Sequence, residues 1–332
     1  MKRSIMALLV VTAVILSVSA SASFASDPVI RIIYADVNPI DTIVGQTATT
    51  FRDKVYELSN GSIIIDVRAG GVLGSEEHKM DDMIAGIGTM QMSRFSTFVF
   101  NARGARLSSL LQMPFIFESR EHFWNFAHSD LAQDLLGESL ELGLGMRSLF
   151  FGEEGFRHFF TRNPVTGLES FQGLQLRVPP DPITVGMVEA IGASAVVIPF
   201  TDLYTALSTG VVDGAEQPVI NYEANVFNEP APNLILNGHT MGIWQVVILE
   251  SVWQSMTDNQ RNAMQEAAAY TMEFVRTSSE RLEQESLERL RARGVNVVDV
   301  PDKGPWIEAV SSVVEANIVG MEDIFQQIVD LN

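Results

Sequence analysis

The chain has 332 residues, of which 46% are hydrophobic, 41 are acidic and 22 are basic, so its formal net charge is −19. A chain this acidic is a poor partner for nucleic acid or for an anionic membrane surface. It contains no cysteine, which excludes disulfides, thiolate metal sites and thiol catalysis. The hydrophobic content is enough to bury a core in one large or two medium domains.

The first 25 residues have the pattern of a secretory signal peptide. Lys2 and Arg3 precede an apolar run over residues 5–18, and the small residues Ser23 and Ala25 follow it. A membrane anchor is the alternative, but the run is short for crossing a bilayer, and no lipidation cysteine follows it. We therefore expect cleavage after Ala25 and a soluble exported protein, which is periplasmic in a cell with an outer membrane.

Strands and helices alternate along the rest of the chain, which favours an α/β fold. The apolar periodicity predicts strands at about residues 30–34, 62–67, 149–151, 174–178, 196–198, 233–236, 243–249 and 295–298. It predicts helices at about residues 42–58, 75–85, 182–191, 201–210, 218–228, 257–293 and 305–329. No polar linker and no internal repeat divides the chain.

The helix expected from Thr257 to Arg293 is unusually long and contains neither proline nor glycine. At 1.5 Å per residue it reaches on the order of 50 Å. One stripe of this helix is apolar, formed by Met264, Ala268, Met272, Val275, Leu282 and Leu290. A coiled coil is the alternative, but Ser279 and Ser286 interrupt the apolar seam. We expect instead a helix that braces two lobes.

The segment from Gly173 to Pro218 carries the most informative functional pattern. Its first strand alternates apolar and polar residues and ends at a run of prolines, after which a helix begins. Arg177 therefore lies near the end of a strand and just before a helix, where open α/β sheets bind their ligands. The alternative is an ordinary strand–helix–strand unit with a surface arginine.

This segment resembles the most distinctive part of the solute-binding proteins of TRAP transporters (tripartite, ATP-independent, periplasmic). The resemblance rests on the runs LRVP, IGA and IPFTDLYTALSTGVVDGAEQP. Two positions depart from the family pattern, because Asp202 replaces a glutamate and Gln217 replaces an asparagine. Further landmarks of the family are the loop 70–74, the run MPFIF at 113–117 and the arginine of Gly155-Phe156-Arg157.

The resemblance implies a two-lobed α/β fold with a ligand cleft between the lobes. We expect one lobe mainly from residues 28–150 with part of 233–270, and the other mainly from 151–232 with the C-terminal segments. The implied function is capture of a small organic acid anion and its delivery to the membrane subunits of a TRAP permease. A sugar acid such as a uronate or an aldonate is favoured, and a four-carbon dicarboxylate is the alternative. A monomer is expected, with a dimer left open.

A carboxylate ligand favours arginine, because its planar guanidinium donates two parallel hydrogen bonds that lysine cannot match. Arginine side chains near strand ends would form a local positive site in this acidic protein. Gln217 takes the place of a ligand-binding amide in the family, and Glu216 is expected to orient an arginine. The residues that we expect to bind ligand are Arg177, Arg157, Arg94, Gln217, His239 and Glu154.

The sequence gives little support to the hypothesis that the protein is an enzyme. The five histidines show no metal-binding spacing, and there is no nucleophile elbow, phosphate-binding loop or dinucleotide motif. We therefore expect no metal and no cofactor. A secreted hydrolase or isomerase could use Glu153 and Glu154 as an acid–base pair, but adjacent residues of a strand point to opposite faces. A ligand-sensing subunit of a receptor is a third interpretation.

Overall fold

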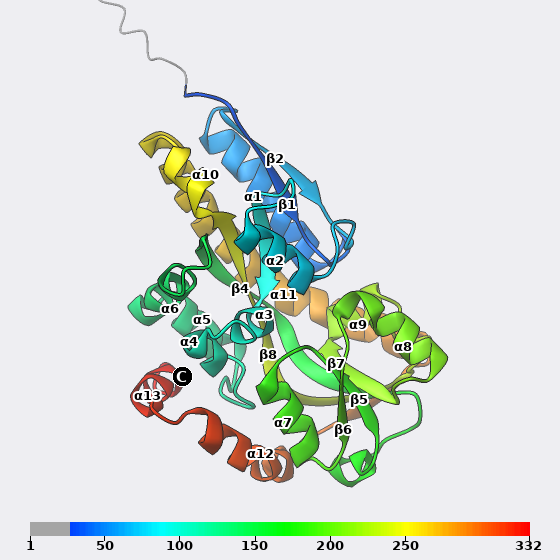
Figure 1. The fold of residues 1–332 in the computed structure, drawn as a ribbon. Coiled ribbons are helices and arrows are strands. Elements are labelled where there is room, and N and C mark those ends of the chain that lie inside the picture. Colours follow the sequence, from blue (N-terminus) through cyan, green and yellow to red (C-terminus); the bar gives the residue numbers. More distant parts are fainter. Residues whose placement is uncertain (1–26) are drawn as a thin grey trace, which may run out of the picture.

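The computed structural model describes residues 27–332 (Figure 1). The expected signal peptide, residues 1–25, lies outside the described residues. Between residues 27 and 332, no helix is both long enough and apolar enough to cross a membrane.

The strands form one mixed sheet, and its order is β2-β1-β3-β8-β4-β7-β5-β6, with β9 paired to β8. Their bounds are β1 Ile30–Ala35, β2 Ile63–Arg68, β3 Met92–Ser96, β4 Met146–Thr161, β5 Gln175–Val178, β6 Ser194–Val197, β7 Gly214–Pro218, β8 Asn233–Leu249 and β9 Asn296–Asp299. Parallel pairs occur at both ends of the sheet, in β1 with β2 and β3 and in β5 with β6 and β7. The antiparallel strands β4 and β8 join the two ends. The prediction of an α/β fold is confirmed.

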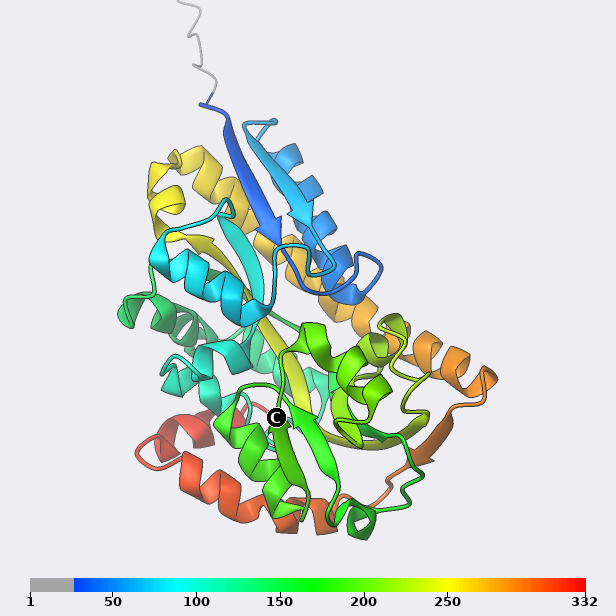
Figure 2. The same ribbon diagram turned by 45° about the vertical axis from the view of Figure 1, so that its right-hand side comes forward.

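The helices lie around this sheet (Figures 1 and 2). Their bounds are α1 Ile43–Leu58, α2 Glu76–Ala85, α3 Thr97–Asn101, α4 Arg106–Leu110, α5 Arg120–Ala127, α6 Asp130–Glu141, α7 Pro182–Ala190, α8 Leu203–Thr209, α9 Val219–Ala224, α10 Glu250–Ser255, α11 Asp258–Ala292, α12 Gly304–Asn317 and α13 Glu322–Val329. Short 3₁₀ turns cover Leu168–Phe171 and Phe200–Asp202.

Two lobes arise because β4 and β8 run through the whole width of the molecule. They pair from Met146 opposite Leu249 to Thr161 opposite Asn233, and each lobe adds its own strands to one end of this ribbon. The largest hydrophobic core lies around β1, α1 and α5 and also includes Ile183 of α7 and Ile220 of α9, and two others lie around β5, β7, α7 and α8. Both long strands are therefore shared connections between the lobes.

Helix α11 braces both lobes, as expected. Its first half packs into the largest core through Met264 and Val275, and Leu290 near its end lies in a core of the other lobe. Thr257 and Gln260 cap its N-terminus reciprocally, since each side chain bonds the backbone N–H of the other residue. Ser279, which interrupts the apolar stripe, is fully buried and bonds Glu153 of β4.

Four predicted elements were wrong in extent. The strand expected at 149–151 is the 16-residue β4, and the strands expected at 233–236 and 243–249 are one strand, β8. Both strands are buried on both faces, so the alternation that marks a half-buried strand is missing from their sequences. The helix expected at 305–329 is divided into α12 and α13, because Gly320 takes a left-handed conformation (φ 77°) between them.

Candidate functional site

A cavity, here called the cleft pocket, lies between the two lobes where strands from each end of the sheet terminate. One lobe lines it with Val37, Asn38, Glu76, Glu77, Arg94, Ser96, Phe98 and Val99, and the other with Glu154, Arg157, Arg177, Pro179, Phe200, Gln217 and Asn221. Strand ends place polar side chains there because the backbone turns outward into loops and helix starts. This is the position at which open α/β sheets bind ligands.

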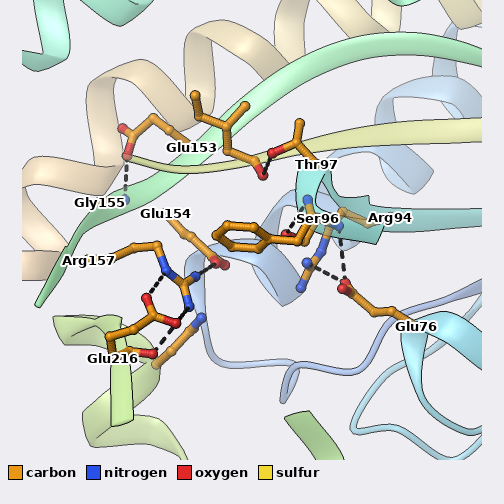
Figure 3. A network of polar contacts seen from close by, with 12 residues as sticks. Glu76, Arg94, Ser96, Thr97, Glu153, Glu154, Gly155, Arg157 and Glu216 are labelled. Carbon is orange, nitrogen blue, oxygen red and sulfur yellow. Dashed lines mark hydrogen bonds and ion pairs between the residues drawn. The ribbon is translucent and has the colours of Figure 1, made fainter. Parts of the chain in front are cut away.

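Arg94 on β3 is only 2% exposed, and acidic side chains of the protein already pair with its guanidinium. Its Nη1 donates to Oε1 of Glu76 (2.7 Å), and its Nη2 and Nε donate to the carboxylate of Asp36 (3.2 and 3.3 Å). Burial alone would lower the pKa of Arg94, but the carboxylates of Asp36 and Glu76 outweigh burial and raise it. Arg94 therefore holds two acids at the wall of the pocket, and Figure 3 shows its contact with one of them, Glu76.

Arg157 on β4 is paired in the same way, but with one acid. Its Nη2 donates to Oε1 of Glu216 (2.7 Å) and to the backbone oxygen of Glu216 (3.2 Å), and its Nε donates to Oε2. The guanidinium lies over the ring of Phe98, 4.9 Å from its centroid. Burial would raise the pKa of Glu216, but Arg157 outweighs it and lowers that pKa to about 2. Glu216 thus orients an arginine, as its position in the sequence predicts.

His239 on β8 lies behind this pair and does not line the pocket. Its Nε2 is 3.5 Å from Oε2 of Glu216, its Nδ1 is 3.1 Å from Oδ1 of Asn237, and its ring stacks on Phe159 at 4.4 Å. Burial lowers the pKa of His239, although Glu216 opposes this, so the imidazole is neutral at pH 7. The structure thus places His239 against Glu216, one layer away from the cavity.

Arg177 at the end of β5 differs from the other two arginines. It is 2% exposed, and its side chain makes one hydrogen bond to the described residues, from Nε to the backbone oxygen of Ile198 (2.7 Å). Between residues 27 and 332, no acidic side chain lies within ion-pair distance of it. Burial lowers the pKa of Arg177 to about 10, so the guanidinium is protonated at pH 7 but poorly compensated.

Glu154 on β4 contributes an acceptor to the pocket. It is 5% exposed, its Oε1 is 3.8 Å from Nη1 of Arg157, and its Oε2 is buried with no hydrogen-bond partner among the described residues. Burial raises the pKa of Glu154, while Arg94 and Arg157 oppose the rise. Figure 3 shows Glu154 directed toward Arg157.

Gln217 on β7 lines the pocket, and its side-chain amide makes no hydrogen bond to the rest of the described chain. Two asparagines that the sequence analysis did not select also line the pocket, Asn38 and Asn221. Asn38 lies in the loop three residues after β1, and Asn221 lies on α9, three residues after β7, so both follow the end of a strand closely. Strand-end position was therefore a signal that applied to these residues too.

Glu153, the neighbour of Glu154, points to the other face of β4. It is fully buried against α11, where it accepts a hydrogen bond from Ser279 and pairs with Arg120 at 2.5 Å. The two glutamates therefore do not share a cavity (Figure 3), as the alternation of strand side chains requires. In the described part of the chain, no group of three or more acidic or histidine side chains could hold a metal ion.

Comparison with protein families gives one match that covers most of the chain. Residues 34–319 match the family described as bacterial extracellular solute-binding protein, family 7. A relative in Rhodobacter capsulatus, named as a C4-dicarboxylate-binding periplasmic protein, is 24% identical over 95% of this chain and 94% of its own.

Two solved structures share the fold over almost their whole length. One is a TRAP periplasmic solute-binding protein from Pseudomonas putida F1 with bound D-glucuronate, at 26% identity and a TM-score of 0.85, covering 90% of this chain and 96% of that one. The other is from Xanthobacter autotrophicus Py2 with bound β-D-galacturonate, at 25% identity and a TM-score of 0.85, covering 90% and 99%.

Proposed function

Because the chain belongs to family 7 of the bacterial extracellular solute-binding proteins, we propose that it captures a small organic acid anion and delivers it to a TRAP-type membrane permease. The membership confirms the resemblance found in segment 173–218, and the solved relatives confirm the two-lobed fold. The proposal is of binding without turnover, since the family consists of transport proteins and Glu153 and Glu154 lie on opposite faces of β4.

The observation that carries the proposal is the uncompensated guanidinium of Arg177. A buried cation without a counter-charge is unfavourable, and a ligand carboxylate would compensate it with two parallel charge-assisted hydrogen bonds. Arg94 and Arg157 already have protein carboxylates as partners, so Arg177 is the cation that most needs an anion from outside.

We assign roles to the other site residues around Arg177, which we take as the residue that binds the ligand carboxylate. Arg157 has a second nitrogen, Nη1, whose closest acid is Glu154 at 3.8 Å, and we propose that it donates to a ligand oxygen. Arg94 and Gln217 complete the polar wall, and Glu154 accepts from the ligand. His239 acts through Glu216 by fixing the acid that orients Arg157.

A sugar acid is the favoured ligand, because two solved relatives hold D-glucuronate and β-D-galacturonate. The Rhodobacter relative supports the alternative, a four-carbon dicarboxylate. Export follows from the family, and we propose that a signal peptide is cleaved after Ala25.

Calorimetric titration with D-glucuronate tests the role of Arg177. Losing one partner of a buried charge pair costs about 2–5 kcal/mol, roughly 30- to 5,000-fold in affinity. Arg177→Met should therefore scarcely bind, and Arg177→Lys should bind measurably worse, because lysine keeps the charge but not the paired geometry. The melting temperature of the ligand-free protein should not fall, since the removed cation was uncompensated.

Arg147→Met is the matched control, because Arg147 on β4 pairs with Glu250 (2.8 Å) and does not line the pocket. It should bind D-glucuronate as the wild type does. If Arg177→Met binds within about threefold of the wild type, or fails to fold, Arg177 is structural and the proposed clamp is wrong.

A further inference from the structure

We infer that the cleft pocket selects an acid whose far end donates hydrogen bonds and rejects one with a second carboxylate, and that Glu154 is the specificity-determining residue. The inference rests on the proposed function, because it takes Arg177 as the partner of the first carboxylate. It would separate sugar acids from the dicarboxylates bound by the same fold.

The first step is the distribution of charge around the pocket. Arg94 faces Asp36 and Glu76, and Arg157 faces Glu216 with Glu154 close by. In the described chain, Arg177 is the only arginine of the pocket without an acidic partner. One ligand carboxylate can therefore be neutralised there, and a second would meet arginines that protein carboxylates already occupy.

The second step is the set of acceptor atoms that the protein leaves unpaired. Oε2 of Glu154 and the Oδ1 atoms of Asn38 and Asn221 are buried at the pocket, and none has a hydrogen-bond partner within residues 27–332. A buried acceptor without a donor is unfavourable, so each of these atoms favours a ligand that supplies N–H or O–H groups.

Glu154 decides between donors and a second carboxylate, because the two asparagines can rotate their amides but an ionised carboxylate only accepts. Arg157, at 3.8 Å, favours that ionised form, whereas burial raises the pKa of Glu154, so the ligands are compared at pH 8, where more of the carboxyl is ionised. A ligand hydroxyl or ammonium would donate the hydrogen bond that Oε2 of Glu154 lacks within the described residues. A ligand carboxylate there would place two like charges side by side in one buried site.

The test uses three ligands that differ only at C6 of one carbon chain. D-gluconate carries a hydroxyl there, 6-amino-6-deoxy-D-gluconate an ammonium, and D-glucarate a carboxylate. Calorimetric titration at pH 8 should show at least about 100-fold weaker binding of D-glucarate than of D-gluconate to the wild type, as expected for a site that must leave buried polar groups unpaired. Comparing D-gluconate with 6-amino-6-deoxy-D-gluconate then shows whether Glu154 prefers a hydroxyl or an ammonium group at C6.

Glu154→Gln keeps the size of the side chain, removes its charge and adds an N–H donor. This change should reduce the ratio of the D-glucarate dissociation constant to the D-gluconate dissociation constant by at least tenfold. Glu223→Gln is the matched control, because Glu223 on α9 pairs with Arg289 outside the pocket (2.7 Å) and should leave the ratio unchanged.

The outcomes separate the inference from the proposed function. Suppose that D-gluconate binds the wild type and that Arg177→Met weakens this binding, so that the proposed function stands. The inference is then overturned if D-glucarate binds as tightly as D-gluconate, or if Glu154→Gln leaves the ratio of their dissociation constants unchanged. If neither D-gluconate nor D-glucuronate binds the wild type, both are contradicted.

Discussion

At the scale of single residues, the junction between β4, α5 and α11 contains two buried carboxylates that share one arginine. Arg120 of α5 donates to Glu153 of β4 (2.5 Å) and also to Glu283 of α11. Ser279 accepts from the same arginine at 2.8 Å. One guanidinium thus serves two buried carboxylates, and it cannot fully compensate both. Burial, reinforced by Glu153, raises the pKa of Glu283 to about 7 although Arg120 opposes the rise.

This pKa predicts a pH dependence of stability. The folded protein binds the Glu283 proton more tightly than the unfolded chain, whose pKa is 4.5. The contribution of this group to stability is therefore complete below about pH 4.5 and lost as the pH rises through about 7. The shift from 4.5 to about 7 amounts to at most about 3 to 4 kcal/mol. Glu283→Gln should accordingly be more stable than the wild type at pH 8 and lose that advantage toward pH 5.

Chemical denaturation of both proteins at pH 5 and pH 8 measures this difference, because the other titrating groups are common to both. Glu288→Gln, an exposed change on the same helix, should follow the wild type. A constant difference between Glu283→Gln and the wild type at the two pH values would show that Glu283 does not titrate in this range.

Strand-end position and the family resemblance were enough to predict that Arg94, Glu154, Arg157, Arg177 and Gln217 lie together at one pocket. They could not show which arginine lacks a partner, because that depends on distances between strands far apart in sequence. Asp36 meets Arg94 across β1 and β3, and Glu216 meets Arg157 across β4 and β7. The position of His239 behind Glu216 was inaccessible for the same reason.

At the scale of elements, one hydrogen bond joins α3 to the start of α7 across the cleft. Nδ2 of Asn101, at the end of α3, donates to Oδ1 of Asp181, the N-cap residue of α7. The other carboxylate oxygen of Asp181 accepts from the backbone N–H and the hydroxyl of Thr184 (both 2.7 Å). Asn101 follows β3 and Asp181 follows β5, so this bond links elements at opposite ends of the sheet.

Asn101→Ala should weaken ligand binding without contacting the ligand, because it removes a bond formed only when α3 and α7 meet. A hydrogen bond to a charged group contributes about 1.5–3 kcal/mol, roughly 10- to 150-fold in affinity. The cap of α7 should persist, since Thr184 still bonds Asp181. Titration with D-glucuronate beside melting curves of the ligand-free protein measures both effects.

The matched control is Asn125→Ala, because Asn125 of α5 bonds the exposed C-terminal segment at the backbone oxygen of Leu331 (2.9 Å). Its ligand affinity should equal that of the wild type. An Asn101→Ala protein with unchanged affinity would mean that the α3–α7 bond does not favour the ligand-bound arrangement.

Elements with a strong local pattern were predicted well, and those defined by long-range burial were not. The apolar stripe and the absence of proline and glycine predicted the extent of α11, whose two ends each lie within one residue of the prediction. The strand β8 is buried along almost its whole length and contains Gly238 and Gly242, so its middle resembles a break between two strands. Its continuity comes from pairing with β4, which a local pattern does not encode.

At the scale of the whole molecule, the connections between the lobes favour a hinge. The strands β4 and β8 pass between the lobes and are shared by both, and β4 has irregular pairing near Gly155, which has a left-handed φ of 101°. Register shifts of this kind let a strand bend without breaking the sheet. The pocket lies between the lobes, so closure of the lobes would bury a ligand there.

Ligand should therefore make the protein more compact in solution. A carboxylate that binds Arg177 compensates a buried cation only when the lobes are closed, so the ligand binds the closed form more tightly and shifts the population toward it. Small-angle X-ray scattering with saturating D-glucuronate should give a smaller radius of gyration than the ligand-free protein. The Arg177→Met protein should show no decrease at the same ligand concentration. An unchanged radius in a wild-type sample shown by calorimetry to be saturated would mean that the lobes do not close on the ligand, and β4 and β8 would then be rigid connections.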